Sequence, residues 1–241
     1  MKGIILAGGT GSRLFPLTKV TNKHLLPVGR EAMIMHPIQK MKEAGIHRIL
    51  IVTGTDHMGD IVSLLGSGKE HGVEFTYRVQ DEAGGIAQAL SLGENFAGGD
   101  PICVVLGDNI FQDSIADDAE AFRQQGGGAR VMLKQVHDPE RYGVARLEGS
   151  KVVEVLEKPE HPPSDWAVTG IYFFDSKVFD IIRTLKPSGR GEYEITDVNN
   201  AYIQSGEMTF GRFTGWWTDA GTFPSYFLAN RLMATAEDSE Q

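Results

Sequence analysis

The chain has 241 residues, and 23 Lys and Arg against 32 Asp and Glu give it a formal net charge of −9 at neutral pH. This length accommodates one large α/β domain or two small ones, and the negative charge excludes a general nucleic-acid-binding protein, which needs a positive surface. The first apolar run, residues 4–7, is too short for a signal peptide or a membrane span, so we expect a cytoplasmic protein with no membrane partner.

The chain begins with a predicted strand over residues 2–6 that leads directly into a turn rich in glycine. The turn reads Gly8-Gly9-Thr10-Gly11-Ser12-Arg13 and is followed by Lys23. Backbone N–H groups without side chains between them can surround a phosphate, and the two cations add positive charge. The third glycine of the dinucleotide fingerprint and the Gly-Lys-Ser/Thr end of the P-loop are both missing. The turn therefore predicts a nucleoside triphosphate site of another class, and a plain strand-to-loop turn is the alternative.

Strands and helices are expected to alternate through the rest of the first half. Helices are predicted over residues 33–44, 60–65, 85–93 and 116–124, and strands over residues 48–53, 73–79, 102–106 and 130–136. The single cysteine, Cys103, falls in an apolar run and is expected to be a reduced core residue. This alternation predicts a Rossmann-like α/β fold with a mixed, mainly parallel sheet and helices on both of its faces.

The second half has a different pattern. A hairpin is predicted from residues 144–147 and 152–157, strands over 168–174 and 208–213, and helices over 178–185 and 195–205. The last predicted helix, residues 224–237, is amphipathic and carries Phe227, Leu228 and Leu232. No linker separates the halves. We therefore expect a single domain over residues 1–241, with a nucleotide-binding half (1–136) and a substrate-binding half (137–241).

Two aspartates are candidate metal ligands. Asp108 follows the most apolar strand, at the sheet edge where ligands bind in open α/β proteins. A carboxylate there suits Mg²⁺, which prefers oxygen ligands and substrate phosphates, although Gly107-Asp108-Asn109 is also typical of a turn. Asp219 is the second candidate, and an ordinary loop aspartate is its alternative.

Glu157-Lys158-Pro159 indicates a sugar phosphate site, because the proline ends a strand abruptly and leaves the lysine projecting from its end. Lys158 would hold a phosphate and Glu157 would accept hydrogen bonds from sugar hydroxyls. A solvated ion pair is the alternative. Tyr142 and Gly143 could pack against a sugar ring, or they could belong to an ordinary loop.

Taken together, these residues resemble the sugar-1-phosphate nucleotidylyltransferases, and within them the glucose-1-phosphate thymidylyltransferases. The similarity covers nearly the whole chain in the order of the family. Its blocks are residues 6–14, Lys23 with 25–28, Gln80 with 84–89, 106–111, 141–144, 157–159, 167–172 and 217–222.

The resemblance implies the nucleotide-diphospho-sugar transferase fold and a Mg²⁺-dependent reaction of dTTP with glucose 1-phosphate that gives dTDP-glucose and pyrophosphate. The products of such enzymes supply polysaccharide synthesis, including the dTDP-rhamnose pathway. The family also implies a homo-oligomer. Its nucleotide-binding residues correspond to Leu6, Ala7, Gly8, Gly9, Thr10, Gly11, Ser12, Arg13, Gln80, Gly85 and Asp108, with the Gln80 amide paired to the thymine edge.

The resemblance assigns the sugar phosphate to Asn109, Tyr142, Gly143, Glu157, Lys158, Val168 and Trp217, and the metal to Asp108 and Asp219. The implied catalytic residues are Arg13, Lys23, Asp108, Lys158 and Asp219.

The chain departs from the thymidylyltransferase pattern in two places. His24 stands where glutamine is usual, and the loop over residues 80–85 is acidic and lacks prolines. A uridylyltransferase, which differs only in the base, is therefore the nearest alternative. A metal-dependent glycosyltransferase and a non-catalytic sugar-nucleotide sensor are more distant ones. The first would not need Arg13 and Lys23, and the second would have lost Asp108, Asp219 or Lys158.

Overall fold

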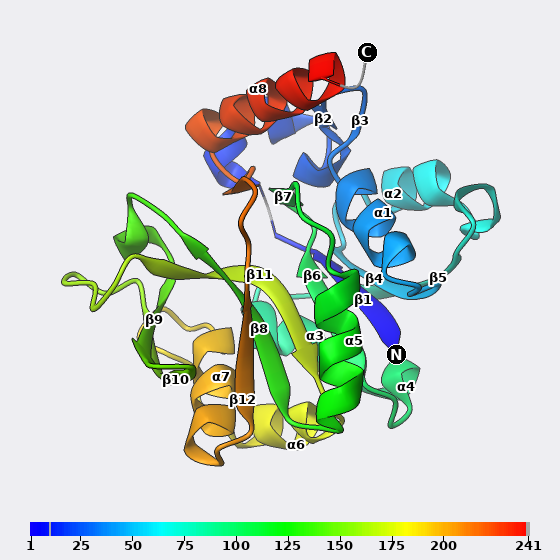
Figure 1. Ribbon diagram of the computed structural model, residues 1–241. Coiled ribbons are helices and arrows are strands. Elements are labelled where there is room, and N and C mark those ends of the chain that lie inside the picture. The colour runs from blue at the N-terminus through cyan, green and yellow to red at the C-terminus, as the bar shows by residue number, and fades with distance from the viewer. Residues whose placement is uncertain (10, 240–241) are drawn as a thin grey trace.

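The computed structural model describes residues 1–9 and 11–239 and is built on a nine-stranded sheet (Figure 1). Seven strands follow the order β10-β9-β11-β6-β1-β4-β5, and β8 pairs with both β11 and β12. The strands are β1 (Lys2–Ala7), β4 (Arg48–Gly54), β5 (Glu74–Gln80), β6 (Ile102–Leu106), β8 (Ala129–Gln135), β9 (Gly143–Glu148), β10 (Lys151–Glu157), β11 (Trp166–Phe174) and β12 (Met208–Arg212).

The N-terminal part of the sheet is parallel. Strand β1 pairs with β4 on one side and β6 on the other, and β5 extends the sheet from β4. The alternation of side chains along β1 sends Ile4 and Leu6 into one core cluster and Ile5 and Ala7 into the other. The predicted α/β fold is confirmed, and the carboxyl ends of these strands meet at one edge.

Strand β11 joins the two halves of the sheet. Its later residues, Ile171 to Phe174, run antiparallel to β6, whereas Ala167 and Val168 run antiparallel to β9. The predicted hairpin of β9 and β10 is also present. Glu157 pairs with Gly143, and Gly143 pairs with Val168, so these three residues form one row across three strands.

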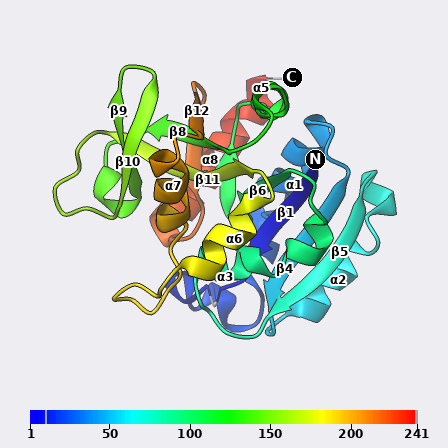
Figure 2. The same ribbon diagram turned by 90° about the horizontal axis from the view of Figure 1, so that it is seen from below.

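Helices cover both faces of the sheet (Figure 2). They are α1 (Met35–Glu43), α2 (Met58–Leu65), α3 (Ile86–Ser91), α4 (Glu94–Ala97), α5 (Ala116–Gln125), α6 (Lys177–Thr184), α7 (Ile195–Gln204) and α8 (Phe223–Ser239). Apolar residues of α1, α2 and α5 belong to one core cluster, and those of α3, α6 and α7 belong to the other.

The helix predicted over residues 85–93 is shorter in the structure. α3 ends at Ser91, and Gly93 precedes the separate short helix α4. Glycine weakens a helix, and at this position it has a packing role: a Cβ on Gly93 would lie 2.6 Å from Cδ1 of Ile4.

Several short elements escape the sequence patterns. Two small ribbons pair β2 (Pro27–Val28) with β3 (Glu31–Ala32) and β7 (Asn109–Phe111) with β13 (Trp217–Asp219). The 3₁₀ turns are η1 (Ser12–Leu14), η2 (Leu17–Lys19), η3 (Lys23–Leu25), η4 (Lys69–His71) and η5 (Pro139–Arg141). An element of only two or three residues is too short to show a hydrophobic pattern, so it cannot be predicted from the sequence in this way.

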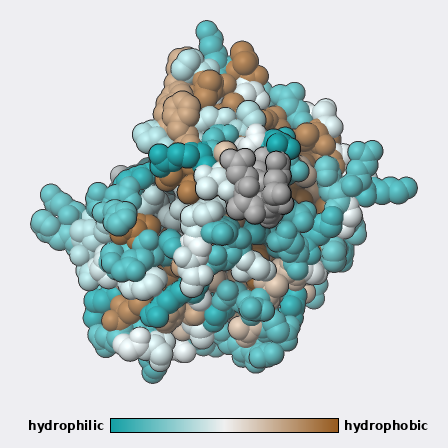
Figure 3. All heavy atoms as spheres, turned by 45° about the horizontal axis from the view of Figure 1, so that its top comes forward, coloured by the Kyte–Doolittle hydropathy of each residue, from teal (hydrophilic) through white to brown (hydrophobic). Residues whose placement is uncertain are grey.

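The apolar face expected for the last helix is only partly correct. Phe227 is 64% exposed, and α8 instead buries Tyr226 and Ala229 in a third cluster with Leu14. The Tyr226 hydroxyl donates to the carbonyl of Pro27 at 2.7 Å, and this bond sets which side of α8 faces inward. In the part of the chain that the structure describes, no helix has the length and apolarity needed to cross a membrane. The face seen in Figure 3 is mostly hydrophilic, with smaller hydrophobic groups between.

Candidate active site

A cavity of about 300 Å³ opens where β1, β5 and β6 end. The residues predicted to bind the nucleotide that line it are Leu6, Gly8, Gly9, Arg13, Gln80, Gly85 and Asp108, and Lys23 lines it as well. Ala7 is buried behind them, and Gly11 and Ser12 lie further along the loop. Thr10 lies outside the described residues. Separate parts of the sequence therefore meet at the carboxyl edge of the sheet, as predicted.

The glycine turn owes its shape to backbone conformation and close packing. Gly9 and Gly11 have φ values of 98° and 61°, a region that side chains disfavour. Leu14, the last residue of η1, is fully buried and packs in the third cluster, which also contains Tyr226 and Ala229 of α8. This packing holds the turn in place. A Cβ on Gly8 would lie 2.4 Å from Oε1 of Gln80, so this glycine makes room for a side chain of the site.

Asp108 and Lys23 form an ion pair inside the site. Nζ of Lys23 lies 2.5 Å from Oδ2 of Asp108, and both side chains are largely buried. Burial alone raises the pKa of Asp108, but the positive charge of Lys23 and its hydrogen bond outweigh that effect and hold the pKa well below its usual range. Asp108 is therefore a carboxylate at neutral pH.

The ribbon of β7 and β13 brings Asp219 beside Asp108. Asp219 pairs in register with Asn109, and the next amide, of Ala220, donates to the carbonyl of Asp108 at 2.7 Å. Burial and the negative charge of Asp108 raise the pKa of Asp219 to about 6. The two carboxylates repel each other, and this is the electrostatic environment that a cation relieves.

Arg13 approaches the Asp108 carboxylate from the glycine turn. A Cβ on Gly221 would lie 3.2 Å from both Nη2 of Arg13 and Oδ2 of Asp108, so these two groups converge over a residue that has no side chain. The predicted cations Arg13 and Lys23 and the predicted metal ligands Asp108 and Asp219 thus form one charged cluster.

The sugar-phosphate candidates lie along the neighbouring strand row. Oε2 of Glu157 accepts from the Thr196 hydroxyl at 2.6 Å, and Oε1 accepts from Nη2 of Arg190 at 3.1 Å. Lys158 leaves the strand with a left-handed φ of 43°, and its Nζ lies 3.7 Å from Oε1 of Glu157. The Lys158 side chain is about half exposed and remains accessible to a ligand.

Asn109 is buried and held by protein groups. Its Oδ1 accepts from Nε1 of Trp217 at 2.8 Å and from the amide of Gly170 at 3.0 Å, and its Nδ2 donates to Oδ1 of Asp108 at 3.1 Å. The ring of Tyr142 meets Trp217 edge-on at 5.3 Å. Through its bond to Oδ1, Asn109 helps to hold the Asp108 carboxylate in position. Contacts of Asn109, Tyr142 and Trp217 with a sugar stay predictions.

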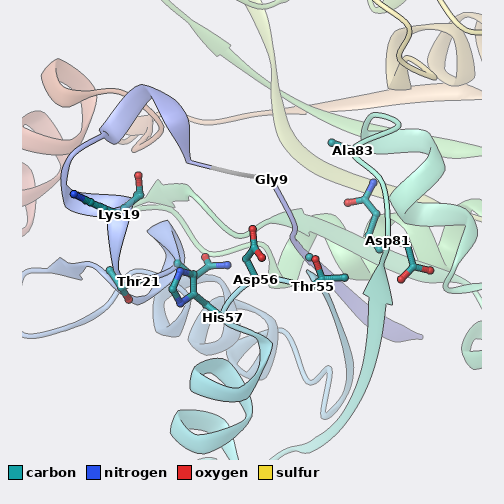
Figure 4. A pocket seen from close by; sticks show the side chains of 12 residues that line it. Gly9, Lys19, Thr21, Thr55, Asp56, His57, Asp81 and Ala83 are labelled. Carbon is teal, nitrogen blue, oxygen red and sulfur yellow. The ribbon is translucent and has the colours of Figure 1, made fainter.

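A second, polar cavity of about 320 Å³ adjoins the first and shares Gly9 and Gln80 with it. Figure 4 shows Asp56 and His57, from the loop after β4, and Asp81, beyond the end of β5, among its lining residues. Asp81 belongs to the acidic loop over residues 80–85 that the sequence singles out, whereas no sequence pattern indicates Asp56 and His57, because they lie in a loop whose position depends on the folded sheet.

Sequence reasoning also missed the loop between α6 and α7. Arg190 bridges Glu157 and Glu194, and Glu192 lines the cavity of about 300 Å³. The amide of Tyr193 donates to the carbonyl of Gly84 at 2.8 Å, so this loop also holds the turn over residues 83–85 at one end of the cavity. The sequence does offer one signal for this loop, because the charged residues Arg190, Glu192 and Glu194 stand beside Gly189 and Gly191.

The comparison with protein families agrees with this geometry. The nucleotidyl transferase family matches residues 2–236, nearly the whole chain. The chain therefore belongs to the nucleotidyl transferase family.

The relatives narrow the similarity further. A glucose-1-phosphate thymidylyltransferase of Neisseria meningitidis is 42% identical over 99% of this chain and 84% of its own length. One of Xanthomonas campestris is 45% identical over 98% of this chain and 81% of its own.

Solved structures show the same similarity. A crystal structure from Bacillus anthracis, assigned to the glucose-1-phosphate thymidylyltransferases and bound to sucrose, is 61% identical with a TM-score of 0.93. That match covers 96% of this chain and 94% of the other. A UDP-glucose pyrophosphorylase with UDP-glucose superposes over 98% of both chains with a TM-score of 0.85, at 25% identity.

Proposed function

We propose that the protein is a glucose-1-phosphate thymidylyltransferase, which transfers a thymidylyl group from dTTP to glucose 1-phosphate and releases pyrophosphate. The observation that carries this proposal is the convergence of Arg13, Lys23, Asp108 and Asp219 at the mouth of the cavity beside the phosphate loop. The relatives from Neisseria meningitidis and Xanthomonas campestris, which match nearly the whole chain, carry that name.

The two sides of the site would hold the two substrates. Residues 6–13 with Gln80 and Gly85 would bind dTTP, and the row of Glu157, Gly143 and Val168 would bind glucose, with Lys158 on its phosphate. Asn109, Tyr142 and Trp217 would complete the sugar side. Apart from Asn109, this assignment follows the predicted division into a nucleotide half, residues 1–136, and a sugar-phosphate half, residues 137–241, which stays a prediction. A homo-oligomer and a cytoplasmic location remain predictions.

Asp108 and Asp219 would hold Mg²⁺. Carboxylate oxygens suit this ion, and the raised pKa of Asp219 reflects a site with unbalanced negative charge. Within the described part of the chain, no group of three or more His, Cys, Asp or Glu residues is placed to bind a metal, so phosphate and water oxygens would complete the coordination. Bound Mg²⁺ would supply positive charge that polarises the phosphates of the nucleotide.

The chemistry requires approach of two anions rather than a general base. An oxygen of the glucose phosphate is already nucleophilic at neutral pH. It forms a bond to the α-phosphorus of dTTP while the bond from that phosphorus to the bridging oxygen breaks. Lys158 would position the attacking phosphate, and Arg13 and Lys23 would stabilise the charge that builds on the departing pyrophosphate.

A pyrophosphate-release assay tests the proposal. Purified protein with Mg²⁺ and glucose 1-phosphate is compared with dTTP, UTP, CTP, ATP and GTP in parallel. We expect fastest release with dTTP and none after EDTA. Faster release with UTP would instead support the uridylyltransferase alternative, which the UDP-glucose pyrophosphorylase fold accommodates. No release with any nucleotide would contradict the assignment.

A further inference from the structure

The side chain proposed to face the base is itself oriented by a neighbour. Gln80 is the last residue of β5 and is only 7% exposed. Its Nε2 donates to Oε1 of Gln88 at 2.6 Å, and Gln88 lies on α3. On the other side, Oε1 of Gln80 lies where a Cβ on Gly8 would be only 2.4 Å away. The amide nitrogen therefore points toward α3, and the amide oxygen points toward the phosphate loop.

The direction of this amide determines which base it can pair with. An amide offers one acceptor and two N–H donors, and the bond to Gln88 leaves one N–H and Oε1 for a ligand. Thymine and uracil present an acceptor at O4 next to a donor at N3. Cytosine presents a donor at N4 next to an acceptor at N3. The same amide pairs with either edge only if it turns over by 180° between them.

We infer that Gln88 is a positioning residue that holds the Gln80 amide in one orientation and so selects thymine or uracil over cytosine. The inference rests on the proposed function, because it assumes that the base binds at Gln80. With the Gln88 amide in its present orientation, turning Gln80 over would bring its Oε1 against Oε1 of Gln88 at the present hydrogen-bond distance and would remove a partly buried hydrogen bond. Gly8 has no side chain and therefore leaves room for the oxygen of Gln80.

Two variants of Gln88 separate orientation from simple packing. Gln88→Glu keeps an acceptor at the same reach and offers no donor, whereas Gln88→Met keeps the length of the side chain and cannot hold the amide. The readout is the ratio of kcat/KM for dTTP to kcat/KM for dCTP, each with glucose 1-phosphate. Both nucleotides carry the same triphosphate, so the ratio cancels the effect of the added charge in Gln88→Glu.

We expect the ratio to be kept or increased in Gln88→Glu and to fall by about tenfold in Gln88→Met, the scale of one lost hydrogen bond. A uniform loss for both nucleotides in Gln88→Met, with the ratio unchanged, would overturn the inference and leave Gln88 a packing residue. An equal fall of the ratio in Gln88→Glu would overturn it as well.

Binding of dTDP and dCDP to the same three proteins, measured by calorimetry, keeps this test separate from the test of activity. If the natural protein releases no pyrophosphate, the proposed function fails. The ratio of the two dissociation constants in the Gln88 variants still decides whether Gln88 orients the base contact.

Discussion

Lys23 has a large effect on the balance of charge in the site, because it pairs with Asp108. It neutralises Asp108, and the second carboxylate, Asp219, keeps a raised pKa because the nearby cations Arg141, Arg13 and Lys23 do not offset both its burial and its repulsion by Asp108. In the proposed function, the site would therefore combine fixed cations for phosphate with a pair of carboxylates for a metal. Such preorganised charge lowers the barrier of phosphoryl transfer, because it need not reorganise as charge moves during the reaction.

Loss of a fixed cation should slow turnover strongly. We expect Arg13→Ala and Lys158→Ala to lower kcat by about 10²-fold, as loss of a transition-state donor does elsewhere. Steady-state pyrophosphate release measures the effect. Lys151→Ala is the matched control, because Lys151 is exposed at the opposite end of β10. A loss in this control as large as in Lys158→Ala would show that strand stability, not charge at the site, is responsible.

His24 makes stability depend on pH. It is buried and bonded through Nδ1 to Oδ1 of Asn22 at 2.7 Å, and burial, followed by the charge of Lys23, lowers its pKa to about 3. The unfolded chain binds a proton below about pH 6.5, whereas the folded chain does not. The stabilisation is therefore complete above pH 6.5 and is lost as pH falls toward 3, by about 2 kcal/mol between pH 6.5 and 5.

Urea unfolding of His24→Gln between pH 7.5 and 5 tests this prediction. Glutamine can donate to Asn22 and does not titrate, so the fall in unfolding free energy should be smaller than in the natural protein. His161→Gln replaces an exposed histidine and should keep the natural slope. Equal slopes in all three proteins would count against the role of His24.

At the scale of elements, the ribbon of β7 and β13 positions the metal candidates. The turn before β13 is held from two sides. The carboxylate of Asp113 accepts from the amides of Thr214 at 2.7 Å and Gly215 at 2.9 Å, while Nζ of Lys134 donates to the carbonyl of Gly215 at 2.6 Å. Asp219 is the last residue of β13, so these hydrogen bonds help to fix the position of its carboxylate.

Removing the hydrogen bonds of Asp113 should weaken metal binding and leave binding of glucose 1-phosphate nearly unchanged. In Asp113→Ala, we expect the Mg²⁺ concentration for half-maximal activity to rise by about tenfold, as outer-shell changes do in other metal sites. The KM for glucose 1-phosphate should stay within twofold. A metal titration of activity gives both values, with Asp117→Ala on the exposed side of α5 as control. An unchanged requirement for Mg²⁺ would contradict the prediction.

At the scale of the whole molecule, β11 ties both halves into one structure. It pairs with β6 of the parallel part, with β8, and with β9 of the C-terminal half. Phe174 is fully buried and stacks between Tyr172 and Tyr202 at ring distances of 5.8 and 5.7 Å. The nucleotide side and the sugar-phosphate side should therefore unfold together.

A substitution that leaves a cavity at Phe174 tests whether the two halves unfold together. We expect Phe174→Ala to lower the free energy of unfolding by about 3–5 kcal/mol while keeping one cooperative transition. Urea unfolding followed by both fluorescence and circular dichroism checks it. Phe227→Ala, at the exposed side of α8, should change stability by less than about 0.5 kcal/mol. Two separate transitions would mean that the halves are independent domains.

Much of the parallel half was predictable. Strands β1, β4 and β6 are apolar runs bounded by glycine or polar turns, and the glycine turn after β1 predicts the phosphate side without any tertiary information. Asp108 follows from the same logic, because a strand end in a parallel sheet lies at the ligand edge. Boundaries moved by one or a few residues where glycines such as Gly93 pack against a distant side chain.

The sequence by itself determined the α/β alternation, the phosphate turn and the identities of the charged residues, because these depend on local period and chemistry. Only the tertiary structure decided which charges meet: Asp219 reaches Asp108 through the pairing of β13 with β7, and Arg190 reaches Glu157 across a loop. The inward side of α8 likewise depends on a contact between distant segments, whereas the Gln80–Gln88 hydrogen bond joins residues eight apart whose meeting depends on how α3 packs against the end of β5. Pairing between distant segments depends on packing and backbone hydrogen bonds that no local pattern records.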